Sequence, residues 1–380
     1  MSSFVTSLYP SVDLIDPVVF KEVNADKNVY FSKPFLKAFE LSNPQIEFKY
    51  VSISDDKKNT VALALVQVIN LSVEGTLKNI KVASLVRKFL SLFFCNEYIK
   101  ILFCGNVFLS GEHGIRSSDR VSKDEVMTQI GTALDAVAAN TKPLHAIFVK
   151  DFKQESLQST RQFLNFGYSE IKVEPNMIVQ LDPEWKTFED YKNILKSKYR
   201  VKANKADSTS SALETRLFTE HDFEAYKEEL QALYQNTIAN ASFNAQVLNL
   251  NTYIHLRATF KDDFIVKAYF LEDKLVGFLT ALVNKNALDA HFIGLDYQLN
   301  KSHAIYPRIL NDYVRLGIEK KVSSINLGRT ASEIKTTVGA IPLELSCYIK
   351  HKNPFFNSLI KPFFRRIKIK EFKQHLPLKN

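Results

Sequence analysis

Short apolar runs alternate with polar turns through the second half of the chain. The runs at 264–271 and 274–284 are separated by a short charged turn, which is the pattern of a β-hairpin. From Ile305 to Ile318 the apolar side chains recur at helical spacing, and Gly317 lies near the end of that stretch. The pattern predicts the order β-β-β-α-β-α-β, with strands over 264–271, 274–284, 287–296, 322–327 and 342–349, helices over 304–321 and 330–338, and a loop over 297–303.

The first half of the chain shows a comparable order of elements. Strands are expected over 48–54, 60–70, 99–103 and 144–149, and helices over 122–139 and 154–164. The two halves share this order with almost no residue identity, which indicates a degenerate internal repeat. A basic helix over about 189–206 links them. The length of 380 residues also exceeds the usual single domain of about 100 to 200 residues.

These patterns predict an α/β (α+β) protein of two tandem domains. Each domain is expected to hold a mixed, mostly antiparallel central sheet flanked by helices. The expected divisions are an N-terminal domain over 1–190, a basic linker helix over 191–206, a C-terminal domain over 207–352 and a basic aromatic tail over 353–380.

The composition is that of an ordinary globular protein, with 46% hydrophobic and 24% charged residues. The first residues lack a basic segment followed by a continuous apolar one, so we expect a cytoplasmic protein. The most apolar windows, 61–73 and 82–94, are shorter than the roughly 20 residues that span a bilayer. We therefore expect no membrane-spanning helix.

Cysteine usage excludes two classes of small site. Cys95, Cys104 and Cys347 form an odd, scattered set, which argues against a disulfide framework and against a structural zinc site. Buried free thiols are the expected state. The sequence also lacks H-E-x-x-H and EF-hand patterns, so no metal ligands are predicted.

The net charge of +9 is concentrated at the C-terminus. Residues 350–380 contain nine Lys or Arg and one acidic residue, Glu371, which gives +8. A second basic run, residues 192–205, has six basic residues and no acidic one. Either run suits a phosphate or an anionic membrane surface.

Four segments resemble one family. They are GLDYQLNKSHAIYPRILNDYV (294–314), NLGRTASEIKTTVGAIP (326–342), KSKYRVKANKA (196–206) and LNFGYSEIKVEPNMIVQLDP (164–183). Together they resemble the GNAT acyltransferase superfamily, and more narrowly its FemAB-like, double-GNAT branch. The resemblance implies two tandem GNAT-like domains in a bacterial enzyme that transfers an acyl group to an amine.

The chain departs from simple GNAT enzymes in one motif. Their glycine-rich Q/R-x-x-G-x-G/A pyrophosphate loop is absent, because the matching stretch is QLNKSH (298–303). The resemblance implies acyl-CoA or acetyl-CoA as the donor, with aminoacyl-tRNA as the alternative that peptidoglycan members of the branch use. The implied acceptor is an amine-bearing small molecule, a lipid or a cell-wall precursor, and no stable protein partner is expected.

The donor site that the resemblance implies lies after the third strand of the second domain. Gly294 and Leu295 would direct backbone N–H groups to the acyl carbonyl, which stabilises a developing oxyanion. Asn300, Ser302 and His303 would approach the donor phosphates at a helix N-terminus. The structural alternatives are a packing role for Gly294 and an N-cap role for Ser302.

Lys335 and Arg329 are the candidates in the NLGRT segment. In the family signature this lysine lies where donor and acceptor meet, and a cation there can stabilise a tetrahedral oxyanion. Arg329 is suited to a carboxylate or phosphate because its guanidinium binds in two places at once. The alternative is a pair of solvated cations at a helix start.

The remaining candidates concern proton transfer and the acceptor. Asp296 is the candidate base, with His291 behind it on the substrate side, and Tyr306 is the candidate donor of a proton to the leaving group. A capping role for Asp296, a core position for His291 and simple packing of Tyr306 are the alternatives. In the first domain the glycine-rich segment 104–115 includes His113 and is expected to border the acceptor or to form a tight turn.

The C-terminal tail interleaves aromatic and basic residues. This composition suits peripheral contact with anionic lipid at the inner face of the membrane, or contact with transfer RNA. Pro354 and Pro362 are expected to break the tail into short helices. The tail could equally fold its aromatic side chains against the domain. From a different functional class, a non-catalytic binding module with the GNAT fold is the alternative to the enzyme.

Overall fold

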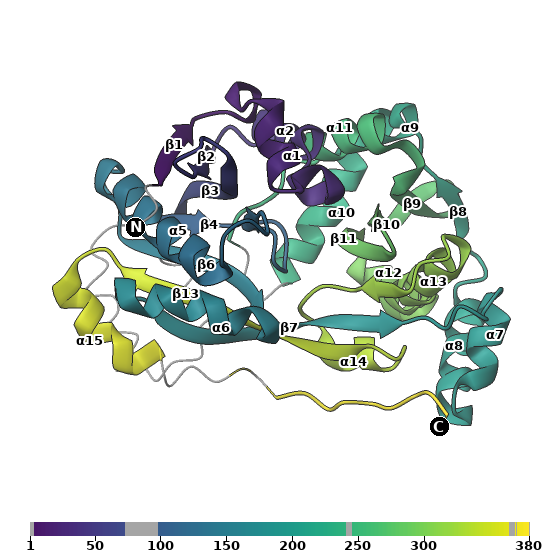
Figure 1. The fold of residues 1–380 in the computed structure, drawn as a ribbon. Helices are drawn as coiled ribbons and strands as arrows, with labels where there is room; N and C mark the ends of the chain where they lie inside the picture. The colour runs from purple at the N-terminus through teal and green to yellow at the C-terminus, as the bar shows by residue number, and fades with distance from the viewer. Residues whose placement is uncertain (1–3, 73–97, 241–244, 365–368, 370, 380) are drawn as a thin grey trace. The chain divides into compact units, whose positions relative to one another are not determined.

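The computed structural model describes residues 4–72, 98–240, 245–364, 369 and 371–379 (Figure 1). The chain forms two compact units. The first unit contains residues 1–173, 242–249 and 344–369, and the second contains 174–241, 250–343 and 370–380. The segment 191–206, expected to be a linker, therefore lies inside the second unit, and the C-terminal tail is divided between both.

A mostly antiparallel sheet of strand order β1-β2-β3-β4-β6-β13 forms the centre of the first unit, and only β4 and β6 are parallel neighbours. The strands are β1 (Val5–Tyr9), β2 (Glu47–Ser54), β3 (Thr60–Ser72), β4 (Tyr98–Cys104), β5 (Ile115–Ser117), β6 (Ala146–Lys153) and β13 (Ile341–His351). The helices are α1 (Pro17–Glu22), α2 (Lys33–Ser42), α5 (Lys123–Asn140), α6 (Leu157–Thr160) and α15 (Pro354–Phe364).

The second unit has the strand order β8-β9-β10-β11-β12-β7, in which only β11 and β12 are parallel neighbours. Its strands are β7 (Ser169–Gln180), β8 (Glu214–Leu217), β9 (Phe264–Leu271), β10 (Lys274–Asn284), β11 (Ala287–Leu295) and β12 (Ser324–Asn326). Its helices are α7 (Phe188–Ile194), α8 (Ser197–Thr209), α9 (Glu220–Ala225), α10 (Lys227–Asn240), α11 (Asn251–Phe260), α12 (Tyr297–His303), α13 (Ile305–Glu319) and α14 (Ser332–Thr336).

Two long strands belong to both units. Strand β7 begins in the first unit and enters the second at Glu174, and β13 enters the first unit at Glu344. The later part of β13, Leu345–His351, pairs antiparallel with β6 of the first unit. The sheet of the first unit is therefore completed by residues from near the end of the chain.

The predicted fold class is confirmed, and so is the predicted order of the second half. Strands β9 and β10 have the predicted bounds, because the charged residues Glu272 and Asp273 form the turn of the hairpin and both adopt positive φ. Helix α13 follows the predicted apolar periodicity, and the polar residues Asn311 and Asp312 are buried together with its apolar side chains.

Three predicted elements are wrong in detail. Residues 297–303, expected to be a loop, form helix α12, because the side chain of Asp296 caps its first turn. The single basic helix is two helices, since Leu195 and Lys196 adopt extended backbone angles between α7 and α8. The tail residues 354–364 form one helix, α15, that contains Pro362.

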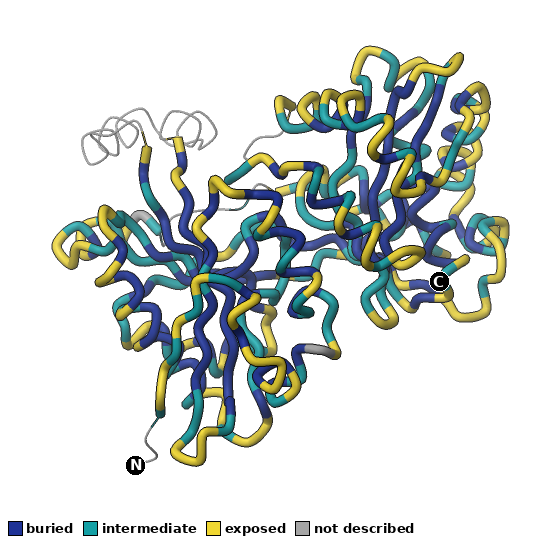
Figure 2. Tube along the Cα trace, turned by 90° about the horizontal axis from the view of Figure 1, so that it is seen from above, coloured by how far each residue is buried: buried dark blue, intermediate teal, exposed yellow. Residues whose placement is uncertain are grey.

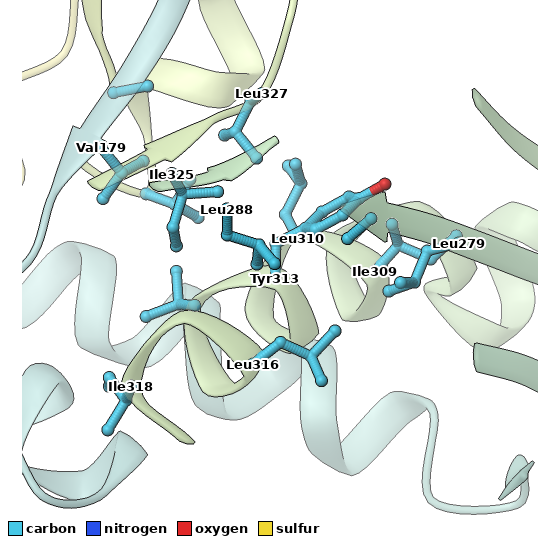
Figure 3. Close-up of a cluster of buried hydrophobic side chains, with 14 of the residues drawn as sticks. Val179, Leu279, Leu288, Ile309, Leu310, Tyr313, Leu316, Ile318, Ile325 and Leu327 are labelled. Atoms are coloured by element: carbon cyan, nitrogen blue, oxygen red, sulfur yellow. The ribbon is translucent and has the colours of Figure 1, made fainter. Parts of the chain in front are cut away.

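The core of the second unit lies between the sheet and α13. Figure 3 shows Leu288 and Ile325 of the sheet beside Leu310 and Tyr313 of the helix, and all four are at most 3% exposed. The Tyr313 hydroxyl donates to the carbonyl of Thr280, which satisfies its polar atom inside the core. In Figure 2 the central strands of each unit are buried along most of their length, and exposure is concentrated in turns and outer helix faces.

An ionic cluster fastens α8 and β9 to α13. The fully buried carboxylate of Asp312 accepts hydrogen bonds from Lys267, Arg308 and Arg315 at 2.9, 3.0 and 2.6 Å. It also accepts a hydrogen bond from Tyr269. Arg315 continues to Asp207 of α8 at 2.5 Å. Burial alone would raise the pKa of Asp312, but the charges of Lys267 and Arg308 outweigh burial, so the pKa is lowered.

Two other expectations concern the membrane and the thiols. In the portion of the chain that the structure describes, no helix is both long and apolar enough to span a bilayer. Cys104 and Cys347 are buried free cysteines, as predicted. The apolar window 82–94 and Cys95 lie outside the described residues.

Candidate functional site

Strands β11 and β12 run side by side over a short distance. Their parallel ladder joins Ala287–Asp289 to Ser324–Asn326, whereas β11 continues to Leu295. On its other edge β11 stays paired with β10 as far as Leu295. Beyond Asp289, β11 therefore has an open edge that β12 does not pair with.

The open edge carries backbone amides of β11. The N–H of Asp296 donates to the carbonyl of Val276 on the β10 side, at 2.9 Å. Successive residues of a strand direct their N–H groups to opposite edges, so the N–H groups of Leu295 and Ile293 point away from β10. Amides fixed in this way can donate hydrogen bonds to a carbonyl oxygen.

Gly294 lies between these two residues and packs tightly. An added Cβ would approach Cε1 of Phe278 and would lie 2.8 Å from backbone atoms of Leu233 and Tyr234. The close approach of α10 to β11 therefore requires glycine at this position. This close packing supports the packing role that the sequence analysis gave as the alternative for Gly294.

Changing Gly294 to alanine should destabilise the chain by about 1–3 kcal/mol, because the neighbouring atoms of α10 are backbone and cannot rotate away. The matched control is Gly328→Ala, where φ is +68° but no atom lies within 4 Å of the added Cβ. There only backbone strain applies, about 1 kcal/mol. Urea unfolding of both variants measures the difference, and an equal or smaller loss for Gly294→Ala would contradict the packing argument.

Asp296 caps helix α12. Its Oδ1 accepts hydrogen bonds from the N–H groups of Gln298 and Leu299 at 2.9 and 3.3 Å, and its Oδ2 lies 3.7 Å from the ammonium of Lys274. The carboxylate thus occupies the positive end of α12. The capping role considered for Asp296 is present in the structure, and a role as base would compete with it.

The start of α13 is also capped by a side chain. Asn300 accepts a hydrogen bond from the N–H of Tyr306 at 2.8 Å. Pro307 has no N–H, and Arg308 N–H already donates to Ala304. Ser302 donates to the carbonyl of Leu299, so it does not cap the helix. The first turn of α13 therefore offers few N–H groups to a phosphate, and the partly buried His303 ends α12 beside it.

Lys335 is buried, with 6% of its surface exposed. Its ammonium donates to the carbonyl oxygens of Leu327 and Arg329, both at 2.6 Å, and to that of Gly328 at 3.3 Å. Burial lowers the pKa of Lys335 to about 7, and the negative charge of Glu174 opposes that shift. In this geometry the lysine holds the backbone of the 327–329 turn.

The turn that Lys335 holds has an unusual backbone. Gly328, Thr330 and Ala331 all adopt positive φ, at 68°, 62° and 48°. Only glycine does so without strain, so the two other residues must be held by their surroundings. The three carbonyl contacts of Lys335 supply that restraint, and they fix the partly buried Arg329 in the turn after β12.

Tyr306 and His291 lie in apolar surroundings. Tyr306 packs against the core of the second unit, and burial raises the pKa of its phenol, so it remains protonated. His291 lies edge-on to the rings of Tyr253 and Phe264, with ring centres 6.2 and 6.0 Å away. His291 is only partly buried, so it packs beside these rings without being a core residue.

In the first unit, the place that corresponds to the open edge of β11 lies at the end of the parallel ladder of β4 and β6, and a loop of the chain occupies it. The parallel ladder of β4 and β6 ends at the pair Cys104 and Val149. Just beyond it, Lys150 donates to the carbonyl oxygens of Asn106 and Leu109 at 2.9 and 2.8 Å, and Asp151 accepts from the N–H of Gly111. A loop held in this way leaves no open strand edge among these residues. The open edge of β11 has no counterpart here.

His113 belongs to this loop of the first unit. Its ring lies 4.2 Å from that of Tyr30, centre to centre. Burial lowers the pKa of His113 to about 4, and the charge of Asp151 opposes the shift. The imidazole is therefore neutral at physiological pH. All the other candidate residues lie in the second unit.

The second unit also contains a cavity of about 280 Å³. It lies between α7, α8, the start of α13 and α14, and its lining includes Tyr199, Lys202 and Lys301. Sequence reasoning missed this site because it treated α8 as a linker. The available signal was the alanine pair Ala203 and Ala206, which lets α8 approach α13 closely.

Comparison with known proteins supplies structures and no sequence relatives. No protein-family model matches the chain, and no curated protein matches it either. FemX superposes with a TM-score of 0.56 at 10% identity, over 91% of this chain and 99% of FemX. A tandem GNAT protein from the clavulanic acid biosynthesis pathway gives 0.55 at 8% identity, over 93% and 99%.

A third structure, L-PGS from Bacillus licheniformis, gives a TM-score of 0.50 at 10% identity, over 93% of this chain and 97% of L-PGS. These likenesses extend over nearly the whole of each chain, and at 8–10% identity they show a shared fold alone. The fold implied by the FemAB-like segments is therefore confirmed. The chain has a tandem GNAT fold similar to that of FemX.

Proposed function

We propose that the chain is an N-acyltransferase that moves an acyl group from an activated donor to an amine. The observation that supports this most strongly is the open edge of β11, where the amides of Ile293 and Leu295 point away from β10. An acyl carbonyl placed at this edge would accept their hydrogen bonds. Those bonds would strengthen as negative charge develops on the oxygen during attack.

The proposed reaction forms an amide and releases the carrier of the acyl group. The neutral amine nitrogen attacks the acyl carbon, the bond from that carbon to sulfur or oxygen breaks, and the proton of the amine passes to the leaving atom. Tyr306 is the proposed donor of that proton, because its raised pKa keeps the phenol protonated. Asp296 and His291 are the proposed groups that receive the proton from the amine.

Arg329 and Lys335 have different proposed roles. Arg329 is proposed to bind a carboxylate or phosphate of the substrate, because its guanidinium suits two-point contact. Lys335 is proposed as a positioning residue that holds the 327–329 turn, since its ammonium is enclosed by three carbonyl oxygens. Direct contact between Lys335 and an oxyanion would require those bonds to break.

The first proposed donor is acyl-CoA or acetyl-CoA, and the acceptor is an amine on a small molecule, a lipid or a cell-wall precursor. A second donor, aminoacyl-tRNA, is favoured by one observation. The side chains of Asp296 and Asn300 cap the starts of α12 and α13, where a pyrophosphate would need free N–H groups. Gly294, Ser302 and His303 remain proposed neighbours of the donor.

Calorimetric and thermal-shift titration with CoA, acetyl-CoA and decanoyl-CoA separates these donors, because a ligand that binds the folded chain raises its stability. We expect saturable binding of an acyl-CoA that weakens about tenfold in Arg329→Gln. Arg216→Gln, on the edge strand β8, is the matched control with the same charge change. If none of the three binds and aminoacyl-tRNA binds instead, aminoacyl-tRNA replaces acyl-CoA as the proposed donor. If none of these ligands binds, the non-catalytic binding module replaces the enzyme as the proposed function.

A further inference from the structure

The cavity of the second unit is not part of the open edge of β11. Its walls come from α7, α8, the end of α12, the start of α13 and α14, and no residue of β11 lines it. Its volume of about 280 Å³ is just below the roughly 300–1,000 Å³ of typical small-molecule sites. The cavity is therefore near the lower size limit of such sites and suits a small ligand.

The floor of the cavity is apolar. It is formed by Tyr191, Leu195, Leu310 and Val338, which belong to the hydrophobic core of the unit and are at most 8% exposed. Water in contact with such a floor has few polar partners. At roughly 30 Å³ for each water-sized group, the volume accommodates about nine non-hydrogen atoms. The floor suits an apolar body of about eight to ten carbons.

The rim of the cavity is cationic. Lys202 and Lys205 reach it from α8, and Lys301 reaches it from α12. None of the three forms an ion pair with a residue that the structure describes, and Lys202 lies 5.7 Å from the ring of Tyr199. Asp207, the carboxylate of α8, is already bound to Arg315 and Asn311. Lysines at the rim that pair with no carboxylate of the described residues attract an anion.

We propose that this cavity binds an amphiphile with one anionic group, a carboxylate or a phosphate, and an apolar chain of about eight to ten carbons. The chain lies on the floor around Leu195 and Leu310, and the anionic group meets Lys202, Lys205 and Lys301 at the rim. This binding goes beyond the proposed acyl transfer, because it is expected whether or not the open edge of β11 performs chemistry.

Calorimetry on the full chain tests the proposal with sodium decanoate and decyl phosphate, each below the concentration at which it forms micelles. We expect one molecule bound per chain. Binding of both anions, or of one of them, supports the site and identifies its anionic group. Decyltrimethylammonium has the same chain with a cationic head, and binding of it at equal strength would overturn the proposal.

Variants separate the rim from general charge effects. Lys202→Gln combined with Lys205→Gln should weaken binding about tenfold or more. Lys198→Gln combined with Lys321→Gln removes the same charge from exposed lysines that do not line the cavity, and should leave binding unchanged. Equal weakening in both double variants would overturn the assignment of the site.

Filling the cavity tests the floor. Thr337 lines the cavity from the turn after α14 and is partly exposed, so a tryptophan there can occupy the space without replacing a core side chain. Thr337→Trp should abolish binding of the ten-carbon anion while circular dichroism stays unchanged. Unaltered binding in a folded Thr337→Trp chain would also overturn the proposal. If Thr337→Trp does not fold, the comparison of the two double lysine variants still tests the site.

Discussion

Replacing Asp312 with alanine is expected to destabilise the chain by about 3–5 kcal/mol, because the change leaves several cations around an empty buried site. Lys267, Arg308 and Arg315 all converge on this one carboxylate, which has no exposed surface. Without it they repel one another, and only Arg315 keeps a carboxylate, that of Asp207. The midpoint of urea unfolding measures the loss.

The matched control is Glu214→Ala, which removes the carboxylate from the exposed pair with Arg216. Pairs in solvent contribute at most about 1 kcal/mol, so this variant should unfold close to the wild type. A loss of less than 1 kcal/mol in Asp312→Ala would show that the buried carboxylate is dispensable. It would also show that the ion pair between Asp312 and Lys267 contributes little to the packing of β9 against α13.

The second large effect is a dependence of stability on pH that originates in Lys335. The pKa of this lysine is about 7 in the folded chain and 10.5 in its ordinary state. Between these values the unfolded chain binds more protons, so raising the pH favours the folded state. The stability of the wild type relative to Lys335→Met should therefore rise by roughly 4 kcal/mol from pH 7 to pH 10.5.

Urea unfolding of both chains at several pH values across this window measures the rise. Lys198→Met, an exposed lysine of α8, is the control and should follow the wild type at every pH. Parallel curves for the wild type and Lys335→Met would mean that Lys335 keeps its ordinary pKa. A lysine that is neutral above pH 7 still donates to Leu327 and Arg329 but offers no charge to an oxyanion.

Regular alternation and turn residues made most of the second unit predictable. The hairpin of β9 and β10 is specified locally by two apolar runs and a charged turn, so its bounds agree with the structure. Helix α12 was missed because its seven residues carry no apolar periodicity, and its start depends on the cap from Asp296. The break between α7 and α8 was missed for a similar reason, since polar residues carry little periodic signal.

The candidate site was less predictable, because the contacts and charge states of its side chains depend on burial. A lysine in a sequence indicates an exposed cation, yet Lys335 is enclosed by carbonyl oxygens of its own turn. The ladder of β11 and β12 ends after three residue pairs, and strand propensity alone does not reveal where pairing stops. The open edge of β11 could be expected only from the family resemblance. The cavity depends on contacts between α8 and α13 that no local sequence pattern encodes.

Strand β13 has a consequence for how the chain folds during its synthesis. Leu345–His351 pair with β6, so the sheet of the first unit needs residues that are synthesised after strands β8–β12 of the second unit. Domains usually fold as units, beginning with the N-terminal one while translation continues. Here the N-terminal unit must wait with β6 unpaired on that edge until β13 has emerged. We therefore expect nascent chains that end before residue 341 to depend on chaperones that shield exposed strand edges.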